Sequence, residues 1–237
     1  MHLFAGIGGG LLADLILGHE PIIAVEWDKY ACRVLRERAS EGWFPDLQVW
    51  EGDVRLFDPS KYIGVVDCIH AGFPCQDLSI AGKQSGLGEG TRSGLYREVI
   101  RIASIVRPRY IFLENVSAIV SNGLGYVLAD LAKMGMDARW CCLRASDVGA
   151  IHHRDRWWLL ANTKRDKQSW EKPCIRPVGR VGGEFKSLAW DRDWESALRC
   201  FRGVDARTAF QVDRTDGIRN AQVPLQAAVA YRLLGGI

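Results

Sequence analysis

The sequence has no apolar run that approaches the roughly 18 residues needed to cross a membrane. Its seven cysteines are an odd number among 237 residues, and no two form a Cys-x-x-Cys pair. This argues against a disulfide framework and a zinc site, so we expect no metal and a reducing, cytoplasmic environment. Residues 1–6 contain no basic segment or cleavage site, which predicts that a signal peptide is lacking.

A strong net charge is lacking as well. The chain carries 31 Lys and Arg against 28 Asp and Glu, a net charge of +3. The excess lies in residues 163–219, which hold thirteen basic and nine acidic side chains. A mildly basic segment suits contact with phosphates, but charge alone is weak support for nucleic-acid binding. The length and the 48% hydrophobic content fit one globular α/β domain with a small appendage.

Short apolar runs alternate with segments of helical periodicity over residues 1–161. This alternation predicts a doubly wound α/β fold with a mostly parallel sheet. No long helix separates the last two apolar runs, so we expect an antiparallel hairpin at the sheet edge. The expected strands are 1–4, 21–25, 47–50, 65–71, 109–113, 138–143 and 157–161, and the expected helices are 9–17, 29–40, 93–106 and 123–134.

The texture of the sequence changes at Asn162. Periodicity fades while polar residues, glycine and proline accumulate, and an apolar helical pattern returns at 223–234. We therefore expect a main α/β domain at 1–161, a small irregular insert at 162–219, and a C-terminal helix at 220–237 that returns to the main domain.

Acidic and glycine residues follow three successive expected strands. The glycine-rich segment Leu3–Gly10 follows a strand and opens a helix, so its backbone can approach a ligand. Glu26 lies twenty residues after Gly6, where a carboxylate can bind ribose hydroxyls, and Asp53 could accept from an adenine amino group. Together they favour a nucleotide site over a plain turn with solvated acids. A nicotinamide cofactor is the competing ligand. The spacing Phe-x-Gly-x-Gly differs from the Gly-x-Gly-x-x-Gly pattern that binds such cofactors, but the glycine run at 6–10 is also compatible with one.

A cysteine stands in an unusual setting at Gly72–Cys75, which reads Gly-Phe-Pro-Cys after an apolar run. A thiol held by a proline turn at the end of a buried strand predicts a nucleophile rather than a packing residue. Cys68, Cys141 and Cys142 lie inside expected strands and fit buried structural thiols.

These motifs, with Glu-Asn-Val at 114–116 following in the same order, resemble the DNA (cytosine-5) methyltransferase family. The resemblance implies a Rossmann-like class I fold that binds S-adenosylmethionine and releases S-adenosylhomocysteine. Residues 1–161 would form the catalytic domain, and 162–219 a small target-recognition region. Such an enzyme would be a compact prokaryotic or viral member.

The resemblance also assigns the chemistry. C5 of cytosine is too weak a nucleophile to take a methyl group directly, so a thiolate adds first at C6. Cys75 would supply that thiolate, and Glu114 would engage N3 and the exocyclic amine. Arg154 would contact the carbonyl oxygen of the base, whereas Arg156 would support the fold through an ion pair. His152 stands where the family usually has glutamine.

The cofactor contacts follow from the same resemblance. Phe4 would pack on the adenine, Glu26 would hold the ribose, Trp27 would cover the adenine and Asp53 would read its amino group. The implied cofactor-binding residues are Phe4, Ala5, Gly6, Ile7, Gly8, Glu26, Trp27, Asp53, Val54, Pro74, Leu95, Asn220 and Ala221. His2, Arg219 and Gln222 depart from the family pattern.

Double-stranded DNA is the partner that the resemblance implies. The glycine-rich segment 81–92 would close over DNA, and the target base would be flipped into the pocket because it is unreachable in a duplex. Trp170, Trp190 and Trp194 fit a small core of the insert better than base contacts. The implied DNA-binding residues are Gln76, Ser79, Lys83, Ser85, Arg92 and Arg156.

Other functions stay open. A cytosine-5 RNA methyltransferase of the same fold is one, although the Cys-Phe-Thr signature of the transfer-RNA branch is not found. A non-catalytic DNA-binding relative is another. A monomer would suffice because one chain carries every catalytic part, and a cognate restriction endonuclease would act separately.

Overall fold

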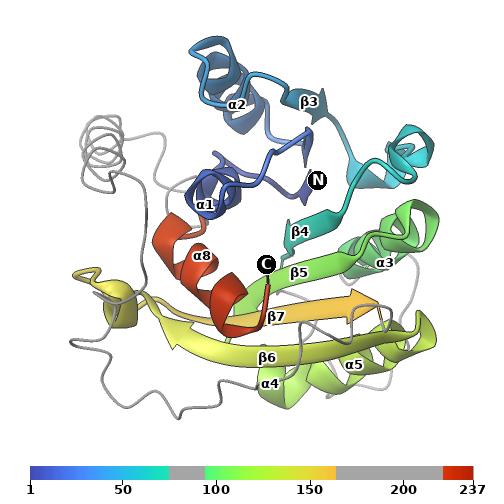
Figure 1. Ribbon diagram of the computed structural model, residues 1–237, viewed down its shortest axis with the longest axis vertical. Coiled ribbons are helices and arrows are strands. Elements are labelled where there is room, and N and C mark those ends of the chain that lie inside the picture. The colour runs from blue at the N-terminus through green and yellow to red at the C-terminus, as the bar shows by residue number, and fades with distance from the viewer. Residues whose placement is uncertain (75–93, 164–220, 237) are drawn as a thin grey trace.

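The computed structural model describes residues 1–74, 94–163 and 221–236. These residues form a seven-stranded sheet of order β3-β2-β1-β4-β5-β7-β6 (Figure 1). The five strands from β3 to β5 pair in parallel, and β7 pairs antiparallel with both β5 and β6. The expected doubly wound sheet and its edge hairpin are both confirmed. The strands are β1 (His2–Leu3), β2 (Ile23–Glu26), β3 (Gln48–Glu51), β4 (Cys68–Gly72), β5 (Tyr110–Val116), β6 (Met136–Arg144) and β7 (Asp155–Thr163).

The helices agree closely with the expected ranges. A short helical turn precedes α5 and stops at Gly123, which the periodicity did not predict. None of the helices in the described ranges has both the length and the apolar character needed to span a bilayer. The helices are α1 (Gly9–Leu17), α2 (Lys29–Ser40), α3 (Gly94–Val106), α4 (Ile119–Asn122), α5 (Leu124–Lys133) and α8 (Pro224–Leu233).

The expected fifth strand is too short, since β5 continues to Val116 and includes Glu114. The start of the fourth strand and the burial of one cysteine are also wrong. The fourth strand begins at Cys68 rather than at Val65, because the Val65 and Val66 N–H groups both donate to the Tyr62 carbonyl in a turn. Cys142 is exposed rather than buried, since β6 is an edge strand. Cys68 and Cys141 are half-buried, and burial raises the pKa of each thiol to about 12, which fits structural thiols better.

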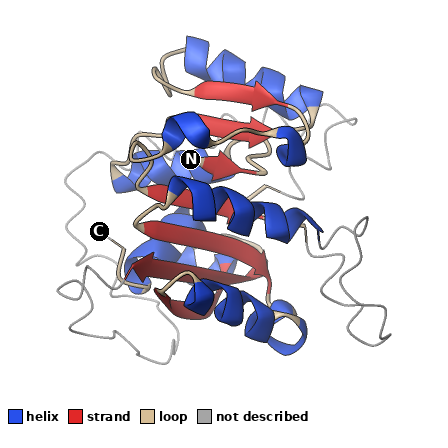
Figure 2. Ribbon diagram, turned by 90° about the vertical axis from the view of Figure 1, so that its right-hand side faces the viewer, coloured by secondary structure: helices blue, strands red, loops and turns tan. Residues whose placement is uncertain are grey.

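Helices cover both faces of the sheet (Figure 2). Alternate residues of β5 point to opposite faces, as a pleated strand requires. Ile111 and Leu113 join the core beneath α3 and α5, whereas Tyr110 and Phe112 pack with α8 on the other face. Glu114 has the same parity as Phe112, so its side chain leaves the strand on the α8 side.

The strand order reverses between β1 and β4, and ligands bind at this switch point in open α/β sheets. The turn after β1 and the ends of β4 and β5 therefore meet at one edge. α8 packs beside α1 although more than 200 residues separate the start of each in the sequence (Figure 1). This return brings Ala221 and Gln222 to the same edge.

Candidate active site

The turn between β1 and α1 has a strained backbone. Phe4, Gly6 and Gly8 have φ angles of 56°, 54° and 97°, in the left-handed region that disfavours most side chains. The Gly8 N–H donates to the Ala5 carbonyl at 3.1 Å and closes the turn. A Cβ at Gly6 would meet nothing within 4 Å, so the backbone there is open to a ligand. The sequence places the expected cofactor at this open, glycine-rich edge.

Glu26 holds that turn in place. Its Oε2 accepts from the Gly6 N–H at 2.7 Å, and its Oε1 accepts from the Trp27 and Asp28 N–H groups at 2.8 and 2.9 Å. A carboxylate offers roughly four acceptor positions, so about one is left for a hydroxyl group. Sequence reasoning gave Glu26 a ligand role and missed this structural one, which only the paired strands β1 and β2 reveal.

The other expected cofactor residues fall into two groups. Trp27 is 77% exposed, so its ring is free to cover a ligand. Asp53 accepts from the Arg55 N–H and from its Nε, at 3.0 and 3.1 Å. Val54, in contrast, is only 5% exposed and its side chain belongs to the core, where Leu95 also packs. Any contact of Val54 with a ligand would therefore have to come from its backbone.

Glu114 is the central charged group of the edge. It is 8% exposed, and its Oε1 lies 2.9 Å from Arg156 Nε in an ion pair. Burial raises the pKa of Glu114 above its ordinary value, although Arg156 and Arg154 act in the opposite direction. The expected ion pair of Arg156 is thus present, which favours a positioning role over direct contact with DNA.

Arg154 links the site to the returning chain. Its Nη2 donates to the Ala221 carbonyl at 2.6 Å, and its φ of 22° is unusual for a residue other than glycine. Burial and the nearby Arg156 lower the pKa of Arg154 from its ordinary value.

Asn115 anchors the segment that leads to the expected nucleophile. Its Nδ2 donates to the Phe73 carbonyl at 3.0 Å, and its Oδ1 accepts from the Val116 N–H at 2.8 Å. This contact joins the end of β5 to the residues just before Cys75. Several expected site residues lie outside the described residues: Cys75, Gln76, Ser79, Lys83, Ser85, Arg92 and Asn220.

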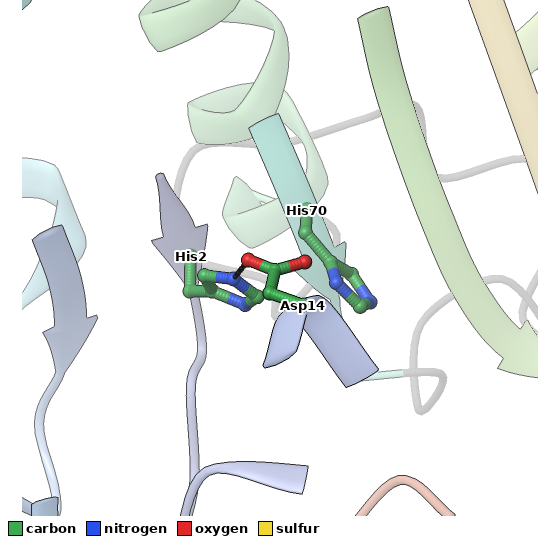
Figure 3. A group of neighbouring side chains, drawn as sticks. All are labelled: His2, Asp14 and His70. Atoms are coloured by element: carbon green, nitrogen blue, oxygen red, sulfur yellow. Dashed lines mark hydrogen bonds and ion pairs between the residues drawn. The ribbon is translucent and has the colours of Figure 1, made fainter. Parts of the chain in front are cut away.

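A buried cluster that the sequence did not suggest lies beneath the turn. His2 Nε2 and Asp14 Oδ2 are 2.6 Å apart, and Figure 3 shows the carboxylate between the rings of His2 and His70. Burial acts to raise the pKa of Asp14, but the imidazoles around it outweigh burial and hold the pKa well below its usual range. Burial lowers the pKa of His70 to about 3, so its ring is neutral.

The three residues offer ligand atoms within 4.8 Å of one another, a spacing that could also hold a metal ion. The contact of Asp14 with His2 gives these two side chains a partner without a metal ion. His70 Nε2, in contrast, is buried without a hydrogen-bond partner among the described residues. That the protein uses no metal stays a prediction.

A cavity of about 40 Å³ joins these parts of the molecule. It is lined by the turn Phe4–Gly6, by His70 and Gly72 of β4, by Glu114, and by Gln222 with its neighbour. Trp27, Asp53 and the two arginines are not among the residues that line it. The structure thus brings the turn Phe4–Gly8 and Glu114 together, with Gln222 between them.

Comparison with known proteins identifies the family. The sequence model described as C-5 cytosine-specific DNA methylase matches residues 1–184. The chain is 32% identical over 203 residues to Type II methyltransferase M.NgoMIV of Neisseria gonorrhoeae, which covers 83% of this chain and 62% of that protein. It is 40% identical over 169 residues to Type II methyltransferase M.HpaII of Haemophilus parainfluenzae, covering 67% and 44%. The chain therefore spans less than two thirds of either relative.

Solved structures agree on the fold. A crystal structure of a Spodoptera frugiperda DNMT2 mutant superposes with a TM-score of 0.59 at 22% identity, covering 77% of this chain and 56% of that one. The Entamoeba histolytica methyltransferase EhMeth gives a TM-score of 0.56 at 18% identity, covering 70% and 53%. Since the family's sequence model matches well over half of the residues, the chain belongs to the C-5 cytosine-specific DNA methylase family.

Proposed function

We propose that the protein transfers a methyl group from S-adenosylmethionine to C5 of a flipped-out cytosine in double-stranded DNA. The observation that carries the proposal is Glu114, a buried carboxyl group with a raised pKa at the strand end beside Gly72. Gly72 lies three residues before Cys75 in the sequence, so we expect the thiol close to this acid. Cytosine activation needs both groups on one ring.

The residues around the turn fit S-adenosylmethionine. Gly6 leaves open space, Glu26 keeps acceptor capacity for a hydroxyl group, and Trp27 presents an exposed ring. The bound cofactor supplies a methyl group on a positively charged sulfur. We propose that Phe4–Gly8, Glu26, Trp27 and Asp53 hold it. Further contacts are proposed for Pro74, Leu95, Asn220 and Ala221.

The chain's own residues would then act in sequence. The Cys75 thiolate adds to C6 of cytosine while Glu114 holds a proton at N3, which makes C5 a carbon nucleophile. After C5 has taken the methyl group, loss of the C5 proton expels Cys75 from C6 and restores the ring. Arg156 fixes one oxygen of Glu114, and Arg154 would face the carbonyl oxygen of the base.

Contacts with DNA are proposed for Gln76, Ser79, Lys83, Ser85 and Arg92. Because relatives carry Type II methyltransferase names, a restriction endonuclease that acts separately is the partner we propose, with the cytoplasm as the place of action. One chain would be sufficient for catalysis.

The decisive experiment is methyl transfer from labelled S-adenosylmethionine to genomic DNA, followed by sequencing that detects 5-methylcytosine. Methylation within a short consensus is the expected result. If methyl groups are transferred only to RNA, the substrate of the enzyme is RNA and the proposed DNA substrate is wrong. DNA that contains 5-fluorocytosine should capture Cys75 covalently, and binding without capture would indicate a non-catalytic relative.

A further inference from the structure

Gln222 lies between the turn Phe4–Gly8 and Glu114 in the lining of the cavity. A Cβ at Gly72 would lie 2.8 Å from Gln222 Nε2 and 3.0 Å from Glu114 Oε2, so both atoms stand over the same glycine. A Cβ at Gly10 would lie 2.8 Å from Gln222 Oε1. The amide therefore reaches from α1 to the ends of β4 and β5, where its Nε2 and Glu114 Oε2 both stand over Gly72. The nearby amide acts to lower the pKa of Glu114.

The backbone around Gln222 is held on two sides. The preceding carbonyl, of Ala221, accepts from Arg154 Nη2 at 2.6 Å. On the other side, the Gln222 backbone lies so close to Gly9 that a side chain there would collide with it. Because α8 begins two residues later and is buried, the amide is delivered to Glu114 by a well-anchored segment.

We propose that Gln222 is a positioning residue for Glu114, whose Oε2 it holds while Arg156 holds Oε1. The inference deepens the proposed function, on which it rests. An amide both donates and accepts, so Nε2 can donate to a carboxylate, and after a rotation Oε1 can accept from a carboxylic acid. Arginine only donates. Gln222 can thus keep the carboxyl group in one orientation in both of its protonation states.

The charged groups near Glu114 do not have this property. Arg154 and Arg156 face it from β7 and the segment before it, and both favour the ionised form. From β4, His70 faces the other end of the amide and is neutral above about pH 3, with His2 and Asp14 behind it. The proton balance of Glu114 therefore depends on burial, on two fixed cations and on the Gln222 amide.

The test is a pH titration of Glu114 in the full chain. It is monitored by NMR of ¹³C-labelled glutamate carboxyl groups. The Glu114 signal is assigned by its loss in Glu114→Gln. Gln222→Met keeps the length of the side chain but removes the donor to the ionised form. Because the donor Nε2 is the amide atom beside Glu114 Oε2, the amide favours the ionised form over the acid. We therefore expect the Glu114 pKa to rise by about one unit in this variant, a tenfold change in the ratio of acid to carboxylate. Gln222→Asn, which keeps an amide that is too short, should show the same direction and guards against misfolding of the first variant.

Gln226 provides a matched control on the same segment. It is fully buried, and its Nε2 donates to the carbonyls of Leu143 and Arg154 at 2.7 and 3.0 Å. Gln226→Met also loses a buried amide, so it should lower the melting temperature while leaving the Glu114 pKa unchanged.

Methyl transfer in a single turnover supplies the second readout. Its pH dependence should shift with the Glu114 pKa in the Gln222 variants and not in Gln226→Met. An unchanged Glu114 pKa in both Gln222 variants, with weaker binding of S-adenosylmethionine, would overturn the proposal and make Gln222 a wall of the cofactor pocket. If the wild type methylates no DNA while the pKa still shifts, the proposed function fails and the contact between the two side chains stands.

Discussion

Replacement of Gly9 by alanine tests how the C-terminal segment docks. Gly9 is buried at the start of α1, and its φ is not positive, so the alanine backbone is unstrained. The added Cβ would lie 3.0 Å from the Gln222 nitrogen, 3.1 Å from its carbonyl carbon and closer still to its oxygen. These are backbone atoms, which cannot rotate away. The segment before α8 must therefore move off α1.

The size of the effect follows from two opposing contributions. Alanine favours a helix over glycine by up to about 1 kcal/mol, whereas forcing an extra carbon into a packed interior costs roughly 1–3 kcal/mol. We expect a net destabilisation of up to about 2 kcal/mol. Each kcal/mol lowers the melting temperature of a chain of this size by about 2–4 °C. Displacement of Gln222 should also slow methyl transfer.

Thermal unfolding followed by circular dichroism measures the effect, and Gly125→Ala is the matched control. Gly125 is exposed within α5, and a Cβ there would meet nothing within 4 Å. This control should therefore stabilise the protein through helix propensity alone. A Gly9→Ala variant that melts at or above Gly125→Ala would refute the packing argument.

Three further predictions concern single residues. Cys75→Ala should abolish methyl transfer while binding of DNA and cofactor persists, and turnover at the wild-type rate would sink the proposed mechanism. Glu26→Ala should weaken the binding of S-adenosylmethionine, measured by calorimetry. It should also lower the melting temperature, because three backbone N–H groups lose their acceptor. An unchanged affinity for S-adenosylmethionine would refute the ligand role of Glu26. For His70, the folded pKa of about 3 lies below the unfolded value of 6.5. The unfolded chain alone therefore gains a proton as pH falls through this window, and stability present above pH 6.5 is lost. In urea unfolding, the wild type should lose about 2 kcal/mol of unfolding free energy to this group between pH 7 and pH 5, and His70→Phe should not lose it. If the unfolding free energies of both proteins fall equally with pH, the His70 ring is not neutral in the folded state.

The sequence predicted the elements well where the signal is local. The periodicity of α1 and α2 marked both ends of each helix, and the missing helix between β6 and β7 predicted their hairpin. The start of β4 was placed too early because Val65 and Val66 are β-branched and apolar, yet a backbone turn to Tyr62 holds them. Propensity is a weak guide where a turn competes.

The buried cluster could not be predicted because it depends on strand order. His2 and His70 are 68 residues apart, but they face each other in the register of β1 and β4. Asp14 reaches them from α1, and their contact is a tertiary one that no spacing rule reports. The same reason hides the role proposed for Gln222, which in the sequence is only a departure from the family pattern.

The glycines of the site show most clearly what sequence alone leaves unresolved. A glycine-rich turn was interpreted as room for a ligand, and Gly6 fits that view because its missing Cβ faces open space. Gly9, Gly10 and Gly72 do not fit it, since the space above each of them is filled by Gln222. Two glycine segments that are sixty residues apart thus accommodate one residue of the C-terminal return. It follows that substitutions at these three positions should act through Gln222 and Glu114, whereas a substitution at Gly6 should act on the cofactor directly.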